Sequence, residues 1–307
     1  MVRPTTNVMT LEGLPLERVE GDLNDASSLE RACRDVRVVY HTAGYYPSHS
    51  VPVEVAIAQG VAETRGVLNA VRQGDVDRLV FTSSLTTIGL PRPDSHNAVP
   101  PANENDPFQP LFPDNPYLMA KAHMEQEVLR EATRNGLPAV VVNPTVFYGP
   151  YDSKPTSGTQ IVMIARRQMP AYIQGAVNVI DVRDVADGMI SAAERGRPGE
   201  RYILGKWNTT QKELNAMIAR IVGARAPMLP IPFPLARYGA KMADWVFQNV
   251  LRRAAPVPGF FVEMLKHMQH YDCSKAIREL GPALRPVEQA ITDATTWFRE
   301  NGRLPAR

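Results

Sequence analysis

Two kinds of apolar pattern alternate along the chain. Short, nearly continuous apolar runs are typical of strands buried on both faces, and they occur at residues 36–40, 78–84, 139–143 and 201–204. Longer segments with apolar residues at helical spacing lie between them, at residues 54–72 and 116–135. Strands that alternate with helices predict βαβ units joined by right-handed crossovers. We therefore expect an α/β fold with a doubly wound parallel sheet.

Polar residues mark where several of these elements begin and end. Asp25 is placed to cap a helix at 26–34, and Gly136 is placed to end the helix at 116–135. Thr210 and Glu213 have the spacing of a capping box that opens another helix.

The remaining pattern divides the chain into two parts. Strands are predicted at 17–22 and 172–181, and the second of these should return to the main sheet through a helix at 182–194. Beyond residue 222 the pattern is helical and broken by prolines, at 234–251, 259–270, 274–280 and 287–300. The domains expected from this pattern are a sheet domain at 1–150 plus 171–204 and a small, mostly helical substrate lobe at 151–170 plus 205–307.

Composition narrows the class of protein. Hydrophobic residues make up 44% of the 307 residues, enough for a core, and 34 basic residues nearly balance 32 acidic ones. That balance gives no case for a nucleic-acid surface. Two cysteines suit a reducing, cytoplasmic location, and no apolar run reaches the ~18 residues of a membrane span. His267 and His270 are the only close histidine pair; we interpret them as a helix-end surface and predict no metal site.

Candidate chemistry gathers where three predicted elements meet. Tyr117 and Lys121 are four residues apart, so they share one helical face, and a nearby ammonium is expected to lower the pKa of the phenol. Ser84 ends one predicted strand and Asn143 ends the next. Because open α/β sheets bind ligands at the carboxyl ends of their strands, these side chains should converge there.

These motifs together resemble those of a known family. The order T-S-S at 82–84, Y-x-x-x-K at 117–121 and N-P-x-x-x-Y-G-P at 143–150 is similar to the extended short-chain dehydrogenase/reductases, also called the NAD-dependent epimerase/dehydratase family. Further matches are E-G-D-L at 20–23, H-T-A-G at 41–44 and D-V-R-D-V-A at 181–186. The nearest branch is dihydroflavonol-reductase-like and includes the hopanoid-associated sugar epimerases. The resemblance implies a Rossmann-like sheet domain.

The resemblance also implies roles for particular residues. Tyr117 would be the general acid/base, Lys121 its activator and a ribose contact, and Ser84 the hydrogen-bond partner of the substrate oxygen, with Ser83 as the alternative. Dinucleotide contacts are implied for Asp22, Leu23, Thr42, Ala43, Gly44, Ser83, Lys121, Asn143 and Pro144. Arg3 stands where an arginine suits a ribose 2′-phosphate, which favours NADP over NAD. Without the family, the Ala-Gly pair would be an ordinary turn, Asp22 a loop carboxylate and Arg3 a surface residue.

Two features depart from the family pattern. The family's N-x-x-G-T has Gly60 and Glu63 at its Asn and Gly positions, which puts the proton relay in doubt. The glycine-rich G-x-x-G-x-x-G loop, whose backbone N–H groups hold a pyrophosphate, does not occur in the sequence. We expect that the first strand–helix–strand unit is absent and that the chain is a shortened form. Such a form should bind NADP(H) weakly or not at all.

Three functions remain open. The leading hypothesis is an NAD(P)-dependent oxidoreductase that transfers hydride between nicotinamide and a secondary alcohol or ketone, on a small or isoprenoid-linked molecule. The alternatives are a sugar or nucleotide-sugar epimerase that retains NAD, and an inactive homologue without cofactor. The sequence does not name the substrate.

Two kinds of contact surface are also predicted. The resemblance implies a homodimer through the helices at 54–72 and 116–135. The segment from Leu235 to Leu251 carries Arg237, Lys241, Arg252 and Arg253 beside Trp245 and Phe247. Packing inside the substrate lobe is the preferred interpretation of this segment, and contact with a membrane surface is the alternative.

Overall fold

The structure is a computed structural model that describes residues 1–307 except 7, 46–50, 94, 96, 253–258 and 305–307. The helices are α1 (Ala26–Cys33), α2 (Val53–Gln73), α3 (Pro116–Asn135), α4 (Gly158–Ala165), α5 (Val182–Arg195), α6 (Gln211–Val222), α7 (Phe233–Asn249), α8 (Gly259–Met264), α9 (Ser274–Leu280) and α10 (Val287–Glu300). Short 3₁₀ helices are η1 (Met9–Leu11), η2 (Leu85–Thr87) and η3 (Leu265–His267). The strands are β1 (Val38–His41), β2 (Arg78–Thr82), β3 (Ala139–Pro144), β4 (Val146–Tyr148), β5 (Ala171–Ile173), β6 (Ala176–Asp181), β7 (Arg201–Leu204), β8 (Trp207–Thr210) and β9 (Leu229–Ile231).

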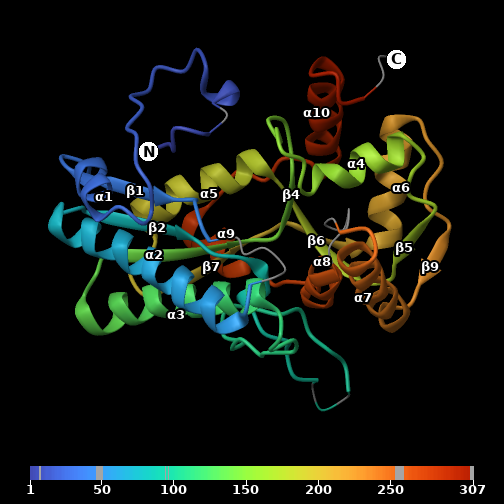
Figure 1. Ribbon diagram of the computed structural model, residues 1–307, viewed down its shortest axis with the longest axis horizontal. Helices are drawn as coiled ribbons and strands as arrows, with labels where there is room; N and C mark the ends of the chain where they lie inside the picture. The colour runs from blue at the N-terminus through green and yellow to red at the C-terminus, as the bar shows by residue number, and fades with distance from the viewer. Residues whose placement is uncertain (7, 46–50, 94, 96, 253–258, 305–307) are drawn as a thin grey trace.

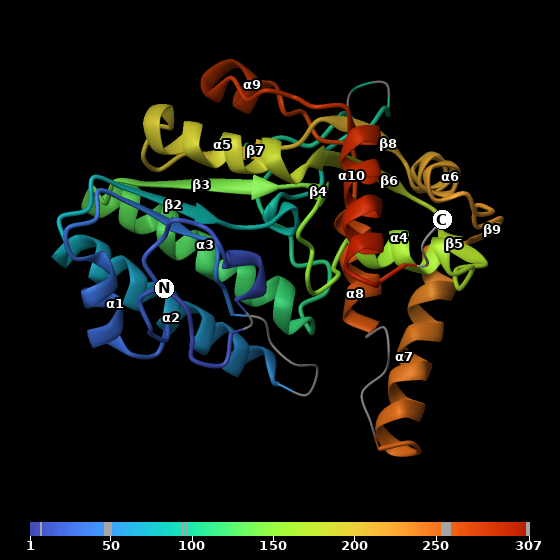
Figure 2. The same cartoon turned by 90° about the horizontal axis from the view of Figure 1, so that it is seen from above.

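Four parallel strands form the main sheet in the order β1-β2-β3-β7. All six residues of β3 are buried, as expected for a parallel strand that is covered on both faces. Residues of α1, α2 and α3 share one apolar core with the sheet, and residues of α5 and α9 share another core on its opposite side. The result is a three-layer α/β arrangement, which confirms the fold class predicted from the sequence (Figures 1 and 2).

The register of the main sheet aligns the ends of its strands. His41 at the end of β1 lies beside Phe81 of β2, and Thr82 at the end of β2 lies beside Val142 of β3. The residues that follow these strand ends therefore emerge at one edge of the sheet, as predicted for a ligand site.

A second sheet lies beyond that edge. β4 pairs in parallel with β6, and β6 pairs antiparallel with β8. The single strand predicted at 172–181 is two strands, β5 and β6, and β6 joins β4 and β8 rather than the main sheet. The helix after them, α5, does pack on the main sheet. Residues from α4, α6 and α10 cover the second sheet with a separate apolar core that includes Leu214, Ile218 and Phe298. A small third sheet pairs β5 with β9.

Helix ends follow the predicted capping chemistry. Asp25 accepts from the Ser27 N–H at the start of α1, and Thr210 and Glu213 form the complete capping box of α6. Gly136 ends α3 with a φ of 69°, a left-handed conformation that glycine adopts at little cost. These predictions are confirmed.

The segment before β1 is less regular than predicted. The strand expected at 17–22 appears, in the part of the chain that the structure describes, as an isolated parallel bridge between Val2 and Glu20. The bridge has backbone hydrogen bonds of 2.9 and 3.1 Å on its two sides, from Val2 to Val19 and from Gly21 to Val2. Among the described residues, no helix is long and apolar enough to cross a membrane.

Candidate active site

Tyr117 lies in the first turn of α3, where the local sequence fixes the helix start. Asn115 caps the helix by accepting from the Leu118 N–H at 3.1 Å, and Pro116 occupies the first helical position, where its missing N–H costs nothing. The Tyr117 side chain is buried, and burial raises the pKa of its phenol, while a hydrogen bond with Ser84 acts in the opposite direction. The pKa of Tyr117 is thus shifted upward, not downward as expected from Lys121, because desolvation outweighs the hydrogen bond from Ser84.

Lys121 lies one turn after Tyr117 and is also buried. Burial lowers the pKa of its ammonium, and the charge of Glu125 opposes that shift. Gly44, just after β1, leaves room for this ammonium, because a Cβ at Gly44 would lie 2.9 Å from Lys121 Nζ. The imidazole of His41 has a pKa lowered to about 4, first by burial and then by the Lys121 charge, so it is neutral at pH 7.

The two candidate serines point to different partners. Ser84 hydrogen-bonds Tyr117 and also accepts from the Thr86 hydroxyl at 3.0 Å. Ser83 is buried, with its hydroxyl 3.4 Å from that of Thr87. Of the two alternatives, the geometry favours Ser84 as the serine beside the phenol.

Asn143 is fully buried at the end of β3. Its amide nitrogen donates to the Ser84 carbonyl at 3.1 Å, to the Thr87 hydroxyl at 2.9 Å and to Glu125 Oε2 at 2.7 Å. Its Oδ1 atom is buried without a hydrogen-bond partner in the described part of the chain. An orphaned buried acceptor of this kind costs free energy unless a ligand donates to it. Pro144, the next residue, lies beside Leu204 of β7.

A buried ion pair underlies these side chains and was missed in the sequence. Arg201 at the start of β7 contacts Glu125 of α3 at 3.0 Å, and both side chains are largely buried. Glu125 also accepts from Thr87, while Arg201 donates to the carbonyls of Glu104 and Asp106 at 2.8 Å. The only sequence signal was position, since Glu125 follows Lys121 by four residues and so shares its helical face.

The residues implied as contacts of the rest of the dinucleotide lie far from Tyr117 in the sequence, and of these Thr42 and Ala43 follow the end of β1. The charge of Arg3 contributes to a lowered pKa of Asp22, after the larger effect of hydrogen bonds from Asn24, so these two side chains are neighbours. Leu23 is partly buried against the core of α1 and α2. Thr42 and Ala43 are exposed directly after β1.

The two departures from the family pattern occupy packed positions on α2. Gly60 lies against α3, because a Cβ there would be 3.0 Å from Met124 Sδ. Glu63 is buried and accepts from Gln59 at 3.1 Å. This close approach of the two helices explains why a small residue stands at position 60.

An apolar cluster lies on the side of Tyr117 that faces the C-terminal helices. Phe112, Tyr117 and Leu118 form its buried part, and Phe233 and Met264 pack against them. Asn115 donates to Glu263 of α8 at 3.1 Å, so α8 is tied to the first turn of α3. The N-terminal cap of α3 thus links this helix to the C-terminal part of the chain.

His267 adds one polar group beside this cluster. Its ring lies 6.3 Å from that of Phe112, its exposed fraction is 1%, and neither ring nitrogen has a hydrogen-bond partner in the described residues. Burial lowers the pKa of His267 to about 4. The interpretation of His267 as part of a helix-end surface is therefore wrong, because η3 turns its side chain inward.

Comparison with known proteins shows the family. The profile of the NAD dependent epimerase/dehydratase family matches residues 2–205, two thirds of the chain. The chain belongs to this family. The family is described as NAD dependent, and the relatives of this chain include reductases and epimerases.

Three members of the epimerase/dehydratase family illustrate that range. A Synechocystis sp. protein named as a dihydroflavonol 4-reductase is 35% identical over 310 residues, 98% of this chain and 87% of that protein. Sterol demethylase protein B of Methylococcus capsulatus is 30% identical over 305 residues, 99% and 91% of the two chains. The crystal structure of PA4631, a nucleoside-diphosphate-sugar epimerase from Pseudomonas aeruginosa, is 28% identical in sequence and has a TM-score of 0.79. The match covers 98% of this chain and 89% of that one. At 16% identity, where likeness shows the fold alone, complexes with NAD and with NADPH give TM-scores of 0.70 and 0.66.

The buried imidazole of His267 should make stability depend on pH. Its pKa in the fold, about 4, lies below the usual value near 6.5, so the unfolded chain binds more protons between these values and stability falls as pH drops through that window. Between pH 7 and pH 5 this one group should cost about 2 kcal/mol. Urea unfolding should be measured at both pH values. From pH 7 to pH 5, the free energy of unfolding of His267→Phe should fall by about this much less than that of the wild type. Equal losses in the two proteins would contradict the assignment.

Proposed function

We propose that this chain is an NADP-preferring reductase that converts a ketone to a secondary alcohol. The observation that carries the proposal is the arrangement around Tyr117, a buried phenol that hydrogen-bonds Ser84 and lies one helical turn from a buried lysine. A raised pKa keeps this phenol protonated at neutral pH, which suits a proton donor to a carbonyl oxygen.

Each side chain of the proposed site has a separate task. The bound nicotinamide supplies the hydride. Tyr117 donates its proton to the substrate oxygen as negative charge develops there, and the Ser84 hydroxyl donates a hydrogen bond to the same oxygen. Lys121 stabilises the phenolate that forms, and its charge acts strongly because the site is dry.

The described residues fit the nicotinamide end of such a cofactor. Gly44 leaves the backbone open beside the Lys121 ammonium, which would contact a ribose hydroxyl, and the orphaned Oδ1 of Asn143 is an acceptor near the same edge. Arg3 beside Asp22 favours a 2′-phosphate, and thus NADP. The two cysteines are free and buried, consistent with a reducing cytoplasm as the proposed location.

An apolar substrate is the class that the surroundings favour. Phe112, Leu118, Phe233 and Met264 make the packing beside Tyr117 apolar, with His267 as an added polar group. The sterol in the name of one relative points the same way.

Removal of one hydroxyl tests the reductase proposal. Tyr117→Phe keeps the buried ring and deletes the proton donor, so kcat should fall by roughly 10²-fold or more with the fold intact. Steady-state assays with NADPH and a panel of apolar ketones provide the measurement. Tyr151→Phe, at an exposed tyrosine, is the control and should leave kcat unchanged. A Tyr117→Phe variant with more than about a tenth of wild-type kcat would remove Tyr117 from the proposed mechanism.

The alternative function is a sugar or nucleotide-sugar epimerase, which the PA4631 relative favours. An epimerase takes a hydride and returns it to the same substrate, so it retains its dinucleotide, whereas a reductase must release it. We expect the purified protein to carry no dinucleotide and to bind added NADPH weakly, because the sequence lacks the glycine-rich loop, but more tightly than NADH in titration calorimetry. Bound NAD released only by denaturation would favour the epimerase, and no binding of either cofactor would favour a chain without cofactor.

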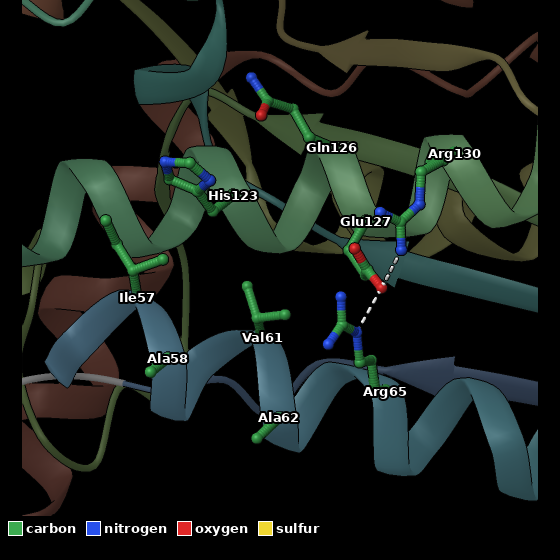
Figure 3. Close-up of a pocket in the computed structure, with 9 residues that line it drawn as sticks. All are labelled: Ile57, Ala58, Val61, Ala62, Arg65, His123, Gln126, Glu127 and Arg130. Atoms are coloured by element: carbon green, nitrogen blue, oxygen red, sulfur yellow. Dashed lines mark hydrogen bonds and ion pairs between the residues drawn. The ribbon is translucent and has the colours of Figure 1, made fainter. Parts of the chain in front are cut away.

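A homodimer through α2 and α3 is also proposed. The two helices border a hollow of about 530 Å³ on the outer face of the molecule (Figure 3). α2 lines the hollow with Ile57, Ala58, Val61 and Ala62, of which Ile57 and Val61 point toward α3. Arg65 and Arg130 converge on Glu127 at its end. α3 faces these apolar residues with the polar side chains of His123 and Gln126. An apolar helix face with polar and charged side chains around it is a composition found at protein interfaces.

A charge at the centre of this hollow should dissociate the dimer. Val61→Glu would bury a carboxylate against its own copy, where like charges repel and are desolvated. Sedimentation velocity at micromolar concentration should give a dimer for the wild type and a monomer for this variant. Ile190→Glu, at a half-exposed position on α5, is the control. A wild-type monomer would contradict the proposed dimer.

A further inference from the structure

The outer face of α7 is apolar and exposed. Leu235, Tyr238, Met242 and Trp245 follow one another at spacings of three and four residues, so they form one stripe, and they are 61–68% exposed. Val250 and Leu251 continue the exposed apolar surface past the end of the helix. The preferred interpretation of this segment, packing within the lobe, is therefore wrong for this face of the helix.

The inner face of α7 explains why the helix forms without burying that stripe. Arg237 contacts Glu263 of α8 at 3.0 Å, and its guanidinium lies 5.0 Å from the centre of the Phe112 ring. Lys241 contacts Asp114 at 3.5 Å. These contacts hold one side of α7 against the lobe, and the helix projects beyond the other described elements (Figure 2).

We propose that α7 is an interfacial helix that docks the protein on the surface of a membrane containing anionic lipids. A helix with one apolar face lies in the boundary between headgroups and acyl chains, and tyrosine and tryptophan are enriched at that depth. α7 has 17 residues and would lie along the surface, since no described helix is long and apolar enough to cross.

Charge favours a lipid surface over a second protein copy. From Met228 to Arg252 the sequence has three basic residues, Arg237, Lys241 and Arg252, and one acidic residue, Asp244. Arg237 is engaged by Glu263 on the inner face, so the cations that a lipid surface could reach are Lys241, which is half exposed although it pairs with Asp114, and Arg252, which is exposed. Cations beside an apolar stripe are attracted to anionic headgroups, whereas a two-fold copy would place these cations near one another. Arg253 lies outside the described residues.

Docking through α7 would also place the apolar cluster beside Tyr117 near the membrane. Phe233, the first residue of the helix, lies 6.1 Å ring to ring from Phe112, which packs with Tyr117 in the apolar cluster. A docked α7 would hold this cluster close to the lipid boundary. The docking itself does not depend on the proposed reaction, because it follows from the stripe and its charges.

Vesicle sedimentation tests the docking with the full chain. The protein should sediment with vesicles of phosphatidylcholine plus phosphatidylserine, should bind less to phosphatidylcholine alone, and should be released by salt. Trp245, the most exposed of the three tryptophans, should give a blue shift in fluorescence on binding, since Trp297 is already buried.

Matched variants test whether the apolar stripe of α7 is the cause of vesicle binding. Trp245→Glu combined with Met242→Glu should lower the partition coefficient at least ~10-fold, because two large apolar groups are lost. Ile190→Glu adds a charge at an exposed apolar site elsewhere and should leave binding unchanged. No sedimentation of the wild type with anionic vesicles would overturn the proposal. So would a self-association that the double variant abolishes in the absence of lipid, since the stripe would then be a protein interface.

Discussion

The buried ion pair between Glu125 and Arg201 is the constraint on which the site depends. It joins the middle of α3 to the first residue of β7, and through Thr87 and Asn143 it also holds η2 and the end of β3. Loss of one partner from such a pair costs about 3–5 kcal/mol, because the other charge is left buried and uncompensated. The pair thereby fixes the rotation of α3, which decides that Tyr117 faces Ser84 and that Lys121 faces Gly44.

Burial then sets the protonation states of the titratable groups Tyr117, Lys121 and His41. Desolvation raises the pKa of Tyr117 and lowers those of Lys121 and His41, so each shift favours the neutral form. For Tyr117 the effect of burial exceeds the opposing hydrogen bond from Ser84. In this dry site the Tyr117 phenol therefore keeps its proton until a substrate oxygen takes it. A charge placed in the site interacts strongly with its neighbours, because little water screens it.

The C-terminal helices are coupled to that site through its cap. Asn115 holds the first turn of α3 and also contacts Glu263, which in turn pairs with Arg237 of α7. The chain of contacts runs from the exposed apolar helix to the turn that carries Tyr117. Its charged links face inward and its apolar stripe faces outward, the reverse of an ordinary surface helix, because the inner neighbours of α7 are acidic and aromatic.

Local patterns in the sequence determined the elements and much of the family chemistry. Apolar runs, the caps at Asp25, Gly136 and Thr210, and the spacing of Tyr117 and Lys121 act over a few residues, so they can be recognised without the fold. Tertiary structure alone decided the pairing of β6 with β8, the inward turn of His267 and the partnership of Glu125 with Arg201, 76 residues apart. It also reversed the expected pKa shift of Tyr117. The physical reason is that desolvation and long-range pairing depend on what surrounds a side chain in space, which spacing along the chain does not specify.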